Sequence, residues 1–502
     1  MRKAYAFCAI LSFMSIVPAW LGGTSWVLLL AAYFIATAVY LLTEKKTPKS
    51  TMVWLLLMWL LPGVGMVAYL FFGRDWHAFG EERRTRRMLR RTLITPAQYP
   101  HLQQLQTQQA AFLHEGSALG DAERRTIRLF LRNSAALLTL HNHVEILQNA
   151  QEKYPRLLAD LRSARHSINL QYYIWESDEF TREVADVLID RVRAGVQVRV
   201  MYDWIGTLGA LDWKYVKHLR DGGVRFEPYL FSQKLHDIGY RNHRKIAVID
   251  GDIGYLGGMN MSNEHLTGGK HFPAWRDTAF RVQGEAAAAL QMIFAVGWFN
   301  TTREMLTEPR MYETSRPDTI TPMQIVSGGP DSEWGALRQM YFRLITQAQR
   351  RILLQSPFFI LDESIAEALK TASLAGVDVR IMLQPRGGVY QIPYRAGLTF
   401  CEEVSRAGAR IYFYGPGYFH PKTIVIDDAV CSIGTANFDT RSTSINYESN
   451  AVFYDSVMAQ RLAQDFQADL AQCTEFSWQE YSRRPWHSRF IDSAYRLLSP
   501  LL

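Results

Sequence analysis

The sequence predicts an α/β protein built from two similar halves and preceded by apolar segments. Each half alternates an apolar strand, a helical stretch and a second apolar strand that follows an Ala-Gly-Val turn, which is the βαβ pattern of a helix-covered sheet. The chain has 502 residues, enough for several domains. We expect membrane segments at 1–75, a linker with a basic run at 76–134, and repeats at 135–318 and 319–502.

The duplication is visible as matched stretches in the two halves. Residues 168–173 correspond to 352–357, residues 194–201 to 375–382, and residues 223–225 to 408–410. Because each copy keeps the same order of strand, helix and strand, the halves are predicted to form one pseudo-dimer of α/β units.

The N-terminal region contains stretches 4–20, 26–42 and 52–72, none of which has a charged side chain. A helix needs about 20 apolar residues to span the hydrocarbon core, so at least two of these stretches should lie in a bilayer. The lysines at 45–49 and the arginine run at 83–91 both favour the cytoplasmic side, yet only one stretch separates them. Either that stretch is re-entrant, bent at Pro62-Gly63-Val64-Gly65, or one basic cluster lies on the other side.

The net charge of +7 is concentrated before residue 92, and the remaining body is close to neutral. Nucleic-acid-binding proteins usually carry a basic face, so no nucleic acid partner is expected. The arginine run follows an apolar stretch, where each basic residue near anionic lipid contributes about 1 kcal/mol. An anionic membrane is therefore the expected partner of this run, with a solvated helix face as the alternative.

The four cysteines show no ligand-like spacing. Neither a zinc site nor a disulfide framework is predicted, and buried free thiols are expected instead.

Each half ends on the same constellation of polar residues, which fits H-x-K-x4-D-x6-G-x2-N. The members are His243, Lys245, Asp250 and Asn260 in the first half, and His420, Lys422, Asp427 and Asn437 in the second. Residues i and i+2 of a strand share a face, so each histidine projects with its lysine, while Arg244 and Pro421 point away. Together the halves would gather two imidazoles, two ammonium groups and two amides around one phosphate site, with no metal or cofactor required.

This doubled pattern resembles the paired HKD signature of the phospholipase D superfamily, over about residues 135–470. The resemblance implies a covalent phosphohistidine intermediate, with His243 as nucleophile and His420 as acid and then base. It also makes Asp277 and Glu448, one downstream of each motif, the candidates to orient the imidazoles.

The predicted catalytic set is His243, Lys245, Asp250, His420, Lys422 and Asp427, and the predicted substrate-binding set is Asn260, Asn437, Asp277 and Glu448. Within the catalytic set, Asp250 and Asp427 are expected to hold the motif loops rather than to touch substrate. Ordinary polar roles are expected for His143, His236 and His265.

The wider sequence resembles bacterial cardiolipin synthases of the phospholipase D type. The shared features are Trp54, Pro62-Gly63-Val64-Gly65, Tyr69, Gly73-Arg74, Trp275-Arg276-Asp277-Thr278, Asn437-Phe438-Asp439 and the ending at 496–502. The resemblance implies a multi-pass enzyme of the bacterial inner membrane that transfers a phosphatidyl group between two phosphatidylglycerol molecules.

Three alternatives stay open at this stage. Water could be the acceptor, as in a membrane-bound phospholipase D, because water and alcohols need nearly the same residues. Another phosphatidyltransferase reaction, for example with phosphatidylethanolamine as the second lipid, would use the same motifs. A non-catalytic membrane scaffold is disfavoured by complete motifs in both halves. The sequence does not fix the oligomeric state.

Overall fold

The computed structural model describes residues 23–44, 48–69, 73, 109, 120–229, 240–385 and 391–499. They fall into two compact units, an N-terminal unit within residues 1–78 and a body that holds both repeats. Stretch 4–20 and the arginine run at 83–91, both expected at a membrane, lie outside the described residues.

The N-terminal unit contains α2 (Gly23–Thr43), α3 (Pro48–Leu60) and α4 (Val64–Ala68). The chain bends between α3 and α4, where Gly63 has a φ of 86°. A Cβ on Gly65 would lie 2.5 Å from the Leu57 carbonyl oxygen, so only glycine allows this close approach. The chain therefore turns at Pro62-Gly63-Val64-Gly65, which is where the re-entrant alternative would place its bend.

Tyr69 holds the three helices of the N-terminal unit together. Its ring packs edge-on against Trp54 at 5.1 Å and against Tyr40 at 6.0 Å. Its hydroxyl donates a hydrogen bond of 2.5 Å to the Glu44 carboxylate. No helix in the described part of the chain is both long enough and apolar enough to cross a membrane.

The body is organised around one 15-stranded sheet, in the order β19-β13-β12-β10-β15-β16-β18-β9-β1-β8-β6-β5-β2-β3-β4. Its strands are β1 (Leu138–Gln148), β2 (Ser167–Tyr172), β3 (Gln197–Asp203), β4 (Arg225–Tyr229), β5 (Ile246–Ile249), β6 (Ile253–Gly257), β8 (Thr278–Gly284), β9 (Ile320–Gly328), β10 (Arg351–Ser356), β12 (Asp378–Leu383), β13 (Arg410–Tyr414), β15 (Thr423–Ile426), β16 (Val430–Gly434), β18 (Glu448–Phe453) and β19 (Cys473–Glu475).

The strand order repeats outward from the antiparallel pair β1 and β9, which lies at the centre of the sheet. Equivalent strands are β1 and β9, β8 and β18, β6 and β16, β5 and β15, β2 and β10, β3 and β12, and β4 and β13. The predicted α/β class and its two repeats are therefore confirmed.

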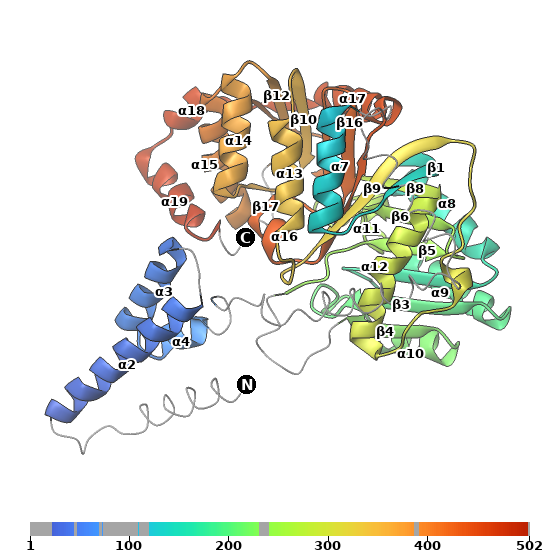
Figure 1. Ribbon diagram of the computed structural model, residues 1–502, viewed down its shortest axis with the longest axis horizontal. Coiled ribbons are helices and arrows are strands. Elements are labelled where there is room, and N and C mark those ends of the chain that lie inside the picture. The colour runs from blue at the N-terminus through green and yellow to red at the C-terminus, as the bar shows by residue number, and fades with distance from the viewer. Residues whose placement is uncertain are drawn as a thin grey trace. The chain divides into compact units, whose positions relative to one another are not determined.

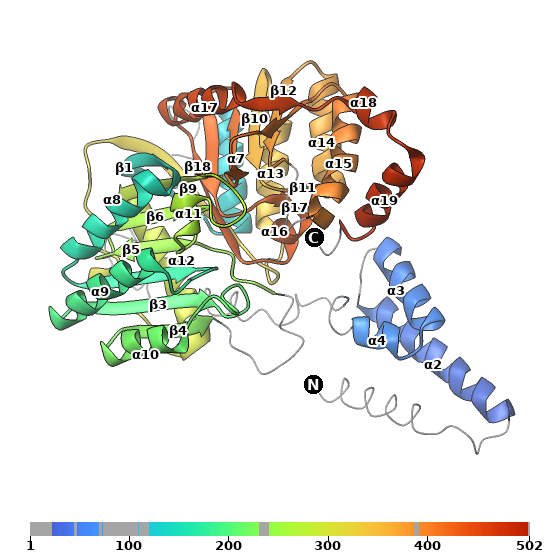
Figure 2. The ribbon, with the colours of Figure 1, turned by 180° about the vertical axis from the view of Figure 1, so that it is seen from behind.

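Helices cover both faces of the sheet (Figure 1 and Figure 2). On one face, α12 (Glu285–Thr302) and α17 (Ser456–Leu470) bury a core that both repeats share. On the other face, each repeat has a core of its own. The helices there are α8 (Asn149–Ser163), α9 (Glu179–Arg193) and α10 (Trp213–Asp221) in the first repeat, and α13 (Ala336–Thr346), α14 (Glu363–Leu374) and α15 (Gln391–Arg406) in the second.

Helix α7 (Asp121–Asn133) precedes the first repeat in sequence but packs in the core of the second. Its buried residues Ile127 and Phe130 contact that core, and Thr126 donates a hydrogen bond of 2.9 Å to the Gln347 amide oxygen. The end of the predicted linker thus belongs to the body, because its apolar stripe is buried there.

Short elements complete the body. They are α11 (Glu264–Thr267), β7 (Trp275–Arg276), a 3-10 turn (Pro309–Met311), β11 (Phe359–Ile360), β14 (Tyr418–Phe419), β17 (Phe438–Asp439), α16 (Thr440–Ser444), α18 (Trp478–Ser482) and α19 (Trp486–Arg496). The cysteines Cys401, Cys431 and Cys473 are free thiols, and the first two are buried as expected.

The motif aspartates Asp250 and Asp427 close equivalent turns, and both have a φ of 53°. The Asp250 carboxylate accepts three backbone hydrogen bonds of 2.7 to 2.9 Å from residues 165–167. The Asp427 carboxylate accepts three of the same length from residues 349–351. Asp250 therefore ties the end of β5 to the start of β2, and Asp427 ties the end of β15 to the start of β10.

We expect Asp250→Ala to lower the free energy of unfolding by about 1–3 kcal/mol, because three backbone N–H groups lose their acceptor. Thermal or denaturant unfolding would measure this loss, with Asp221→Ala as the control, since Asp221 is exposed on a helix surface. A variant at Asp250 with unchanged stability but no activity would show that this aspartate acts in the chemistry.

Candidate active site

The two motif histidines and lysines lie directly before equivalent strands of the sheet. His243 and Lys245 precede β5, and His420 and Lys422 precede β15. All four side chains are buried. The strands β5 and β15 occupy matching places on either side of the β1–β9 pair, so the two motifs are equivalent in the two repeats.

Backbone contacts between the repeats fix this arrangement. Beside the first motif, the His243 N–H donates to the Tyr447 carbonyl oxygen at 3.0 Å, and Asn242 forms an isolated parallel bridge with Tyr447. Beside the second motif, the His420 N–H donates to the Arg276 carbonyl oxygen at 2.8 Å, within the parallel pair of β7 and β14. The residue after each bridging partner is acidic, since Glu448 follows Tyr447 and Asp277 follows Arg276. Each bridge therefore brings a carboxylate of one repeat to the histidine of the other.

The carboxylates consequently pair crosswise with the imidazoles. His243 Nδ1 lies 2.8 Å from Glu448 Oε1, and His420 Nδ1 lies 2.7 Å from Asp277 Oδ2. The His420 contact meets the geometry of a hydrogen bond, whereas the His243 contact is a close approach of the ring nitrogen to the carboxylate that becomes an ion pair only when the imidazole is protonated. The resemblance to the phospholipase D superfamily makes both carboxylates candidates, but it does not predict their exchange between the repeats.

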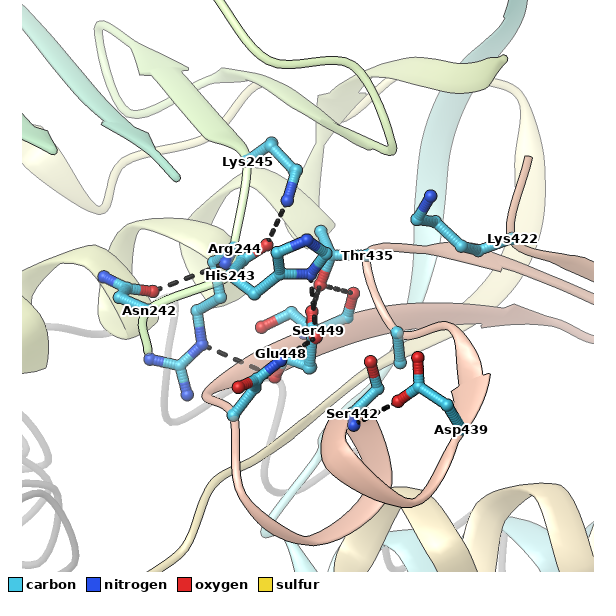
Figure 3. A network of polar contacts seen from close by, with 12 residues as sticks. Asn242, His243, Arg244, Lys245, Lys422, Thr435, Asp439, Ser442, Glu448 and Ser449 are labelled. Atoms are coloured by element: carbon cyan, nitrogen blue, oxygen red, sulfur yellow. Dashed lines mark hydrogen bonds and ion pairs between the residues drawn. The ribbon is translucent and has the colours of Figure 1, made fainter. Parts of the chain in front are cut away.

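The surroundings of the two carboxylates differ. In the second repeat, the Thr435 hydroxyl donates a hydrogen bond of 2.5 Å to Glu448 (Figure 3). The matching residue of the first repeat is Gly258, where a Cβ would lie 2.3 Å from the Asp277 carboxylate. Burial alone would raise the pKa of Glu448. The groups His243 and Lys245 and the Thr435 hydrogen bond outweigh burial and hold this pKa below its ordinary value. Burial instead raises the pKa of Asp277.

Burial favours the neutral form of both histidines. Burial, opposed by the Glu448 charge, lowers the pKa of His243 to about 4. Burial and the charges of Lys422, Lys245 and His243 lower the pKa of His420 well below its ordinary value. Because charges of both repeats act on His420, the two motifs form one site.

The motif lysines are held by their own loops. Lys245 Nζ donates to the His243 carbonyl oxygen, and Lys422 Nζ donates to the His420 carbonyl oxygen, each at 2.6 Å. Burial lowers the pKa of Lys422 to about 8 and that of Lys245 well below its ordinary value. Each ammonium has two further N–H groups, and a bound phosphate anion would restore the charge that burial disfavours. Arg244 points away from Lys245, as expected, and donates to the Ser327 hydroxyl at 2.7 Å.

The other predicted residues take different positions. The Asn260 amide oxygen accepts a hydrogen bond of 3.2 Å from the Ile174 N–H, and the buried Asn437 amide oxygen has no partner among the described residues. Asp250 and Asp427 follow β5 and β15, whereas the histidines precede them. A four-residue strand, about 13 Å long, therefore separates each aspartate from its histidine.

Sequence reasoning missed Lys153 and gave His265 only an ordinary polar role. Lys153 is buried in α8, donates to the Met259 carbonyl oxygen at 3.1 Å, and has a pKa lowered by burial to about 7. His265 Nε2 accepts from the Asn260 N–H at 3.1 Å, and its ring centre lies 6.3 Å from that of His420. The sequence does contain a signal for Lys153. When residues 153–158 are aligned with residues 340–345, Lys153 stands where the second repeat has Met340, so a basic residue replaces an apolar one at this position.

No group of three or more His, Cys, Asp or Glu side chains that could hold a metal ion occurs in the part of the chain that the structure describes. His143, which is half exposed, lies 3.7 Å from Glu145. His236 falls outside the described residues.

We expect Glu448→Gln to lower the pKa of His243 below about 4, because the variant removes the anion that favours the imidazolium. The acid limb of kcat/KM should move to lower pH, and kcat should fall on the order of 100-fold. Histidine-selective NMR titration would measure the shift directly. Asp277→Asn is the matched control, and a His243 titration that moves with Asp277→Asn instead would contradict the crosswise pairing.

Comparison with known proteins gives a consistent family. A family model described as "Cardiolipin synthase, PLD-like domain" matches residues 157–271 and 341–470, and a phospholipase D-nuclease N-terminal model matches residues 26–74. The major cardiolipin synthase ClsA of Bacillus subtilis (strain 168) is 37% identical over 488 residues, which cover 95% of this chain and 99% of that protein. A cardiolipin synthase of Listeria monocytogenes serotype 4a (strain HCC23) is 36% identical over 489 residues, covering 95% and 98%.

Among solved structures, the phosphatidylserine synthase of Haemophilus influenzae Rd KW20 matches with a TM-score of 0.58, covering 75% of this chain and 100% of that one. At 17% identity this likeness concerns the fold alone. The sequence relatives cover nearly the full length of both partners at more than a third identity. The chain therefore belongs to the cardiolipin synthase family of phospholipase D-like enzymes and is a phosphatidyltransferase of this type.

Proposed function

We propose that the chain transfers a phosphatidyl group from one phosphatidylglycerol to the primary hydroxyl of another, giving cardiolipin and glycerol. The observation that carries the proposal is the pair of buried imidazoles, each held by a carboxylate of the opposite repeat and each followed by a buried lysine. Phosphodiester exchange needs a nucleophile, a proton donor and fixed positive charge. The names of the sequence relatives, which are cardiolipin synthases, support cardiolipin as the product.

In the first step, neutral His243 Nε2 attacks the phosphorus of phosphatidylglycerol. The bond from phosphorus to the glycerol headgroup oxygen breaks, and His420, whose protonated form is favoured by the entering phosphodiester anion, gives that oxygen its Nε2 proton, so that free glycerol leaves. His243 then carries the phosphatidyl group as a phosphohistidine. Lys245, Lys422, Asn260 and Asn437 would bind the non-bridging oxygens.

In the second step, the now neutral His420 takes the proton from the primary hydroxyl of a second phosphatidylglycerol. The resulting oxygen attacks the phosphorus, the bond between nitrogen and phosphorus breaks, and cardiolipin forms. His243 returns to its neutral state and His420 is protonated again, so one turnover consumes no net proton.

The carboxylates support His243 as the nucleophile. A phosphorylated imidazole that keeps Nδ1–H is positively charged, and it is stabilised by a firmly ionised partner. Glu448 has a lowered pKa and a hydroxyl donor in Thr435, whereas the pKa of Asp277 is raised. His243, which faces Glu448, is therefore the better site for the covalent step. In this proposal Asp250 and Asp427 act as positioning residues.

The lipid substrates imply action at a membrane. We infer that the apolar N-terminal unit brings the body to the bacterial inner membrane, which supplies both phosphatidylglycerol molecules. The exposed apolar side chains of α2 and α3, among them Leu28 and Val53, support this placement.

Purified protein with phosphatidylglycerol as the only lipid is expected to release glycerol and cardiolipin in equal amounts, with EDTA present throughout. Chelation should not matter, because the lysines supply the positive charge. Mass spectrometry of the lipids and an enzymatic glycerol assay measure the outcome. Phosphatidic acid as the main product would identify a hydrolase, and cardiolipin formed only with added phosphatidylethanolamine would identify a different second lipid.

The histidine variants separate the two roles. His243→Ala and His420→Ala should each reduce turnover by at least 1,000-fold, on the order expected when one member of a catalytic pair is lost. His420→Asn should still accumulate phosphatidylated protein on intact mass, whereas His243→Asn should accumulate none. The reverse pattern would exchange the roles, and full activity of either alanine variant would exclude a shared site.

A further inference from the structure

Helix α19 exposes its apolar side chains and buries an acidic one. Trp486 and Phe490 of α19 and Leu497, which directly follows it, are 76%, 65% and 81% exposed, and Asp492 is completely buried. A surface helix of a soluble protein normally turns its apolar face to the core. The apolar face of α19 is therefore left for a contact outside the body.

Polar contacts fix this orientation. The Asp492 carboxylate lies 3.0 Å from Arg484, 3.4 Å from Arg395 and 3.2 Å from the Tyr481 hydroxyl. Farther along the helix, the Arg496 guanidinium lies 2.6 Å from the Glu403 carboxylate. Ion pairs to α15 and to the segment before α19 thus hold its inner side, and rotation of the helix would break them.

The exposed apolar side chains lie along one side of the helix. At 100° per residue, Trp486, Phe490 and Leu497 fall within an arc of about 40°, and Asp492 lies roughly 140° from Leu497. The rings of Trp486 and Phe490 lie 6.4 Å apart. Exposed Arg483 and Arg489 are close to these apolar side chains in sequence. Aromatic and aliphatic side chains with neighbouring arginines are the composition of a helix that lies in a membrane interface.

We propose that this strip of Trp486, Phe490 and Leu497 docks the body on an anionic lipid bilayer and so brings lipid headgroups to the active site. The occupant follows from chemistry, because arginine attracts anionic lipid and tryptophan favours the interface. The proposal rests on lipid being the substrate. Both ribbon views place the C-terminal end of α19 at the same edge of the second repeat as α16, which follows Asn437 closely (Figure 1 and Figure 2).

A site-specific probe tests the docking without using catalysis. The full chain would carry Phe490→Cys or, as the matched control, Leu374→Cys, each labelled with NBD in a background with Cys8→Ser and Cys473→Ser. Leu374 is 76% exposed at the end of α14, before β12 begins. Phosphatidylglycerol vesicles should blue-shift and brighten the dye at position 490 but not at 374, and phosphatidylcholine vesicles should do so less.

A second arm measures the consequence for turnover. The combination of Trp486→Ser, Phe490→Ser and Leu497→Ser should lower kcat/KM on vesicle phosphatidylglycerol at least tenfold. It should not change kcat/KM on a short-chain phosphatidylglycerol below its critical micelle concentration. The matched control combines Trp213→Ser, Leu374→Ser and Val457→Ser, which alter equally exposed apolar side chains elsewhere.

The outcomes distinguish a failure of the docking proposal from a failure of the proposed function. Cardiolipin synthesis with no dye response at position 490 would overturn the docking surface and leave the function standing. A dye response without cardiolipin synthesis would support the docking and overturn the function. A blue shift of the dye at position 490 without vesicles would also overturn the proposal. If that shift grows with protein concentration, a second copy of the chain covers the strip. If it does not, the chain's own N-terminal helices cover it.

Discussion

The backbone bridges between the two repeats are the constraint on which the site depends. His243 is tied to Tyr447, and His420 to Arg276, by equivalent hydrogen bonds. Each bridge brings a carboxylate of one repeat to the imidazole of the other. Neither repeat alone would hold its histidine, so duplication and packing about β1 and β9 create a site that a single α/β unit lacks.

Burial supplies the second part of the chemistry. The motif lysines and histidines are nearly inaccessible, and burial is the largest cause of every lowered pKa among them. Such groups gain more from an arriving phosphate anion than exposed ones would, because the anion restores charges that the protein interior disfavours. Two buried carboxylates and the hydrogen bonds of the motif loops offset part of the desolvation free energy of these four basic groups.

The two repeats differ at the site, and these differences match the different roles that we propose for the two histidines. Gly258 faces Asp277 where Thr435 faces Glu448, and the Thr435 hydroxyl hydrogen bond helps to keep Glu448 ionised. Lys153 occupies the position of Met340, which adds a basic group beside Asp277 only. The reaction as proposed is also asymmetric, since one histidine bonds to phosphorus and the other moves protons.

The α/β class and the duplication follow from the sequence, because strand periodicity and repeated spacing are local properties. The doubled spacing also predicts the motif histidines and lysines, whereas Asp277 and Glu448 are candidates only through the resemblance to the phospholipase D superfamily. Only the tertiary structure decided the crosswise pairing of His243 with Glu448 and of His420 with Asp277, since that pairing depends on how separate strands meet. It also decided the burial of Lys153 and the outward apolar face of α19. These depend on which neighbours surround a side chain, and a pattern along one chain does not contain that information.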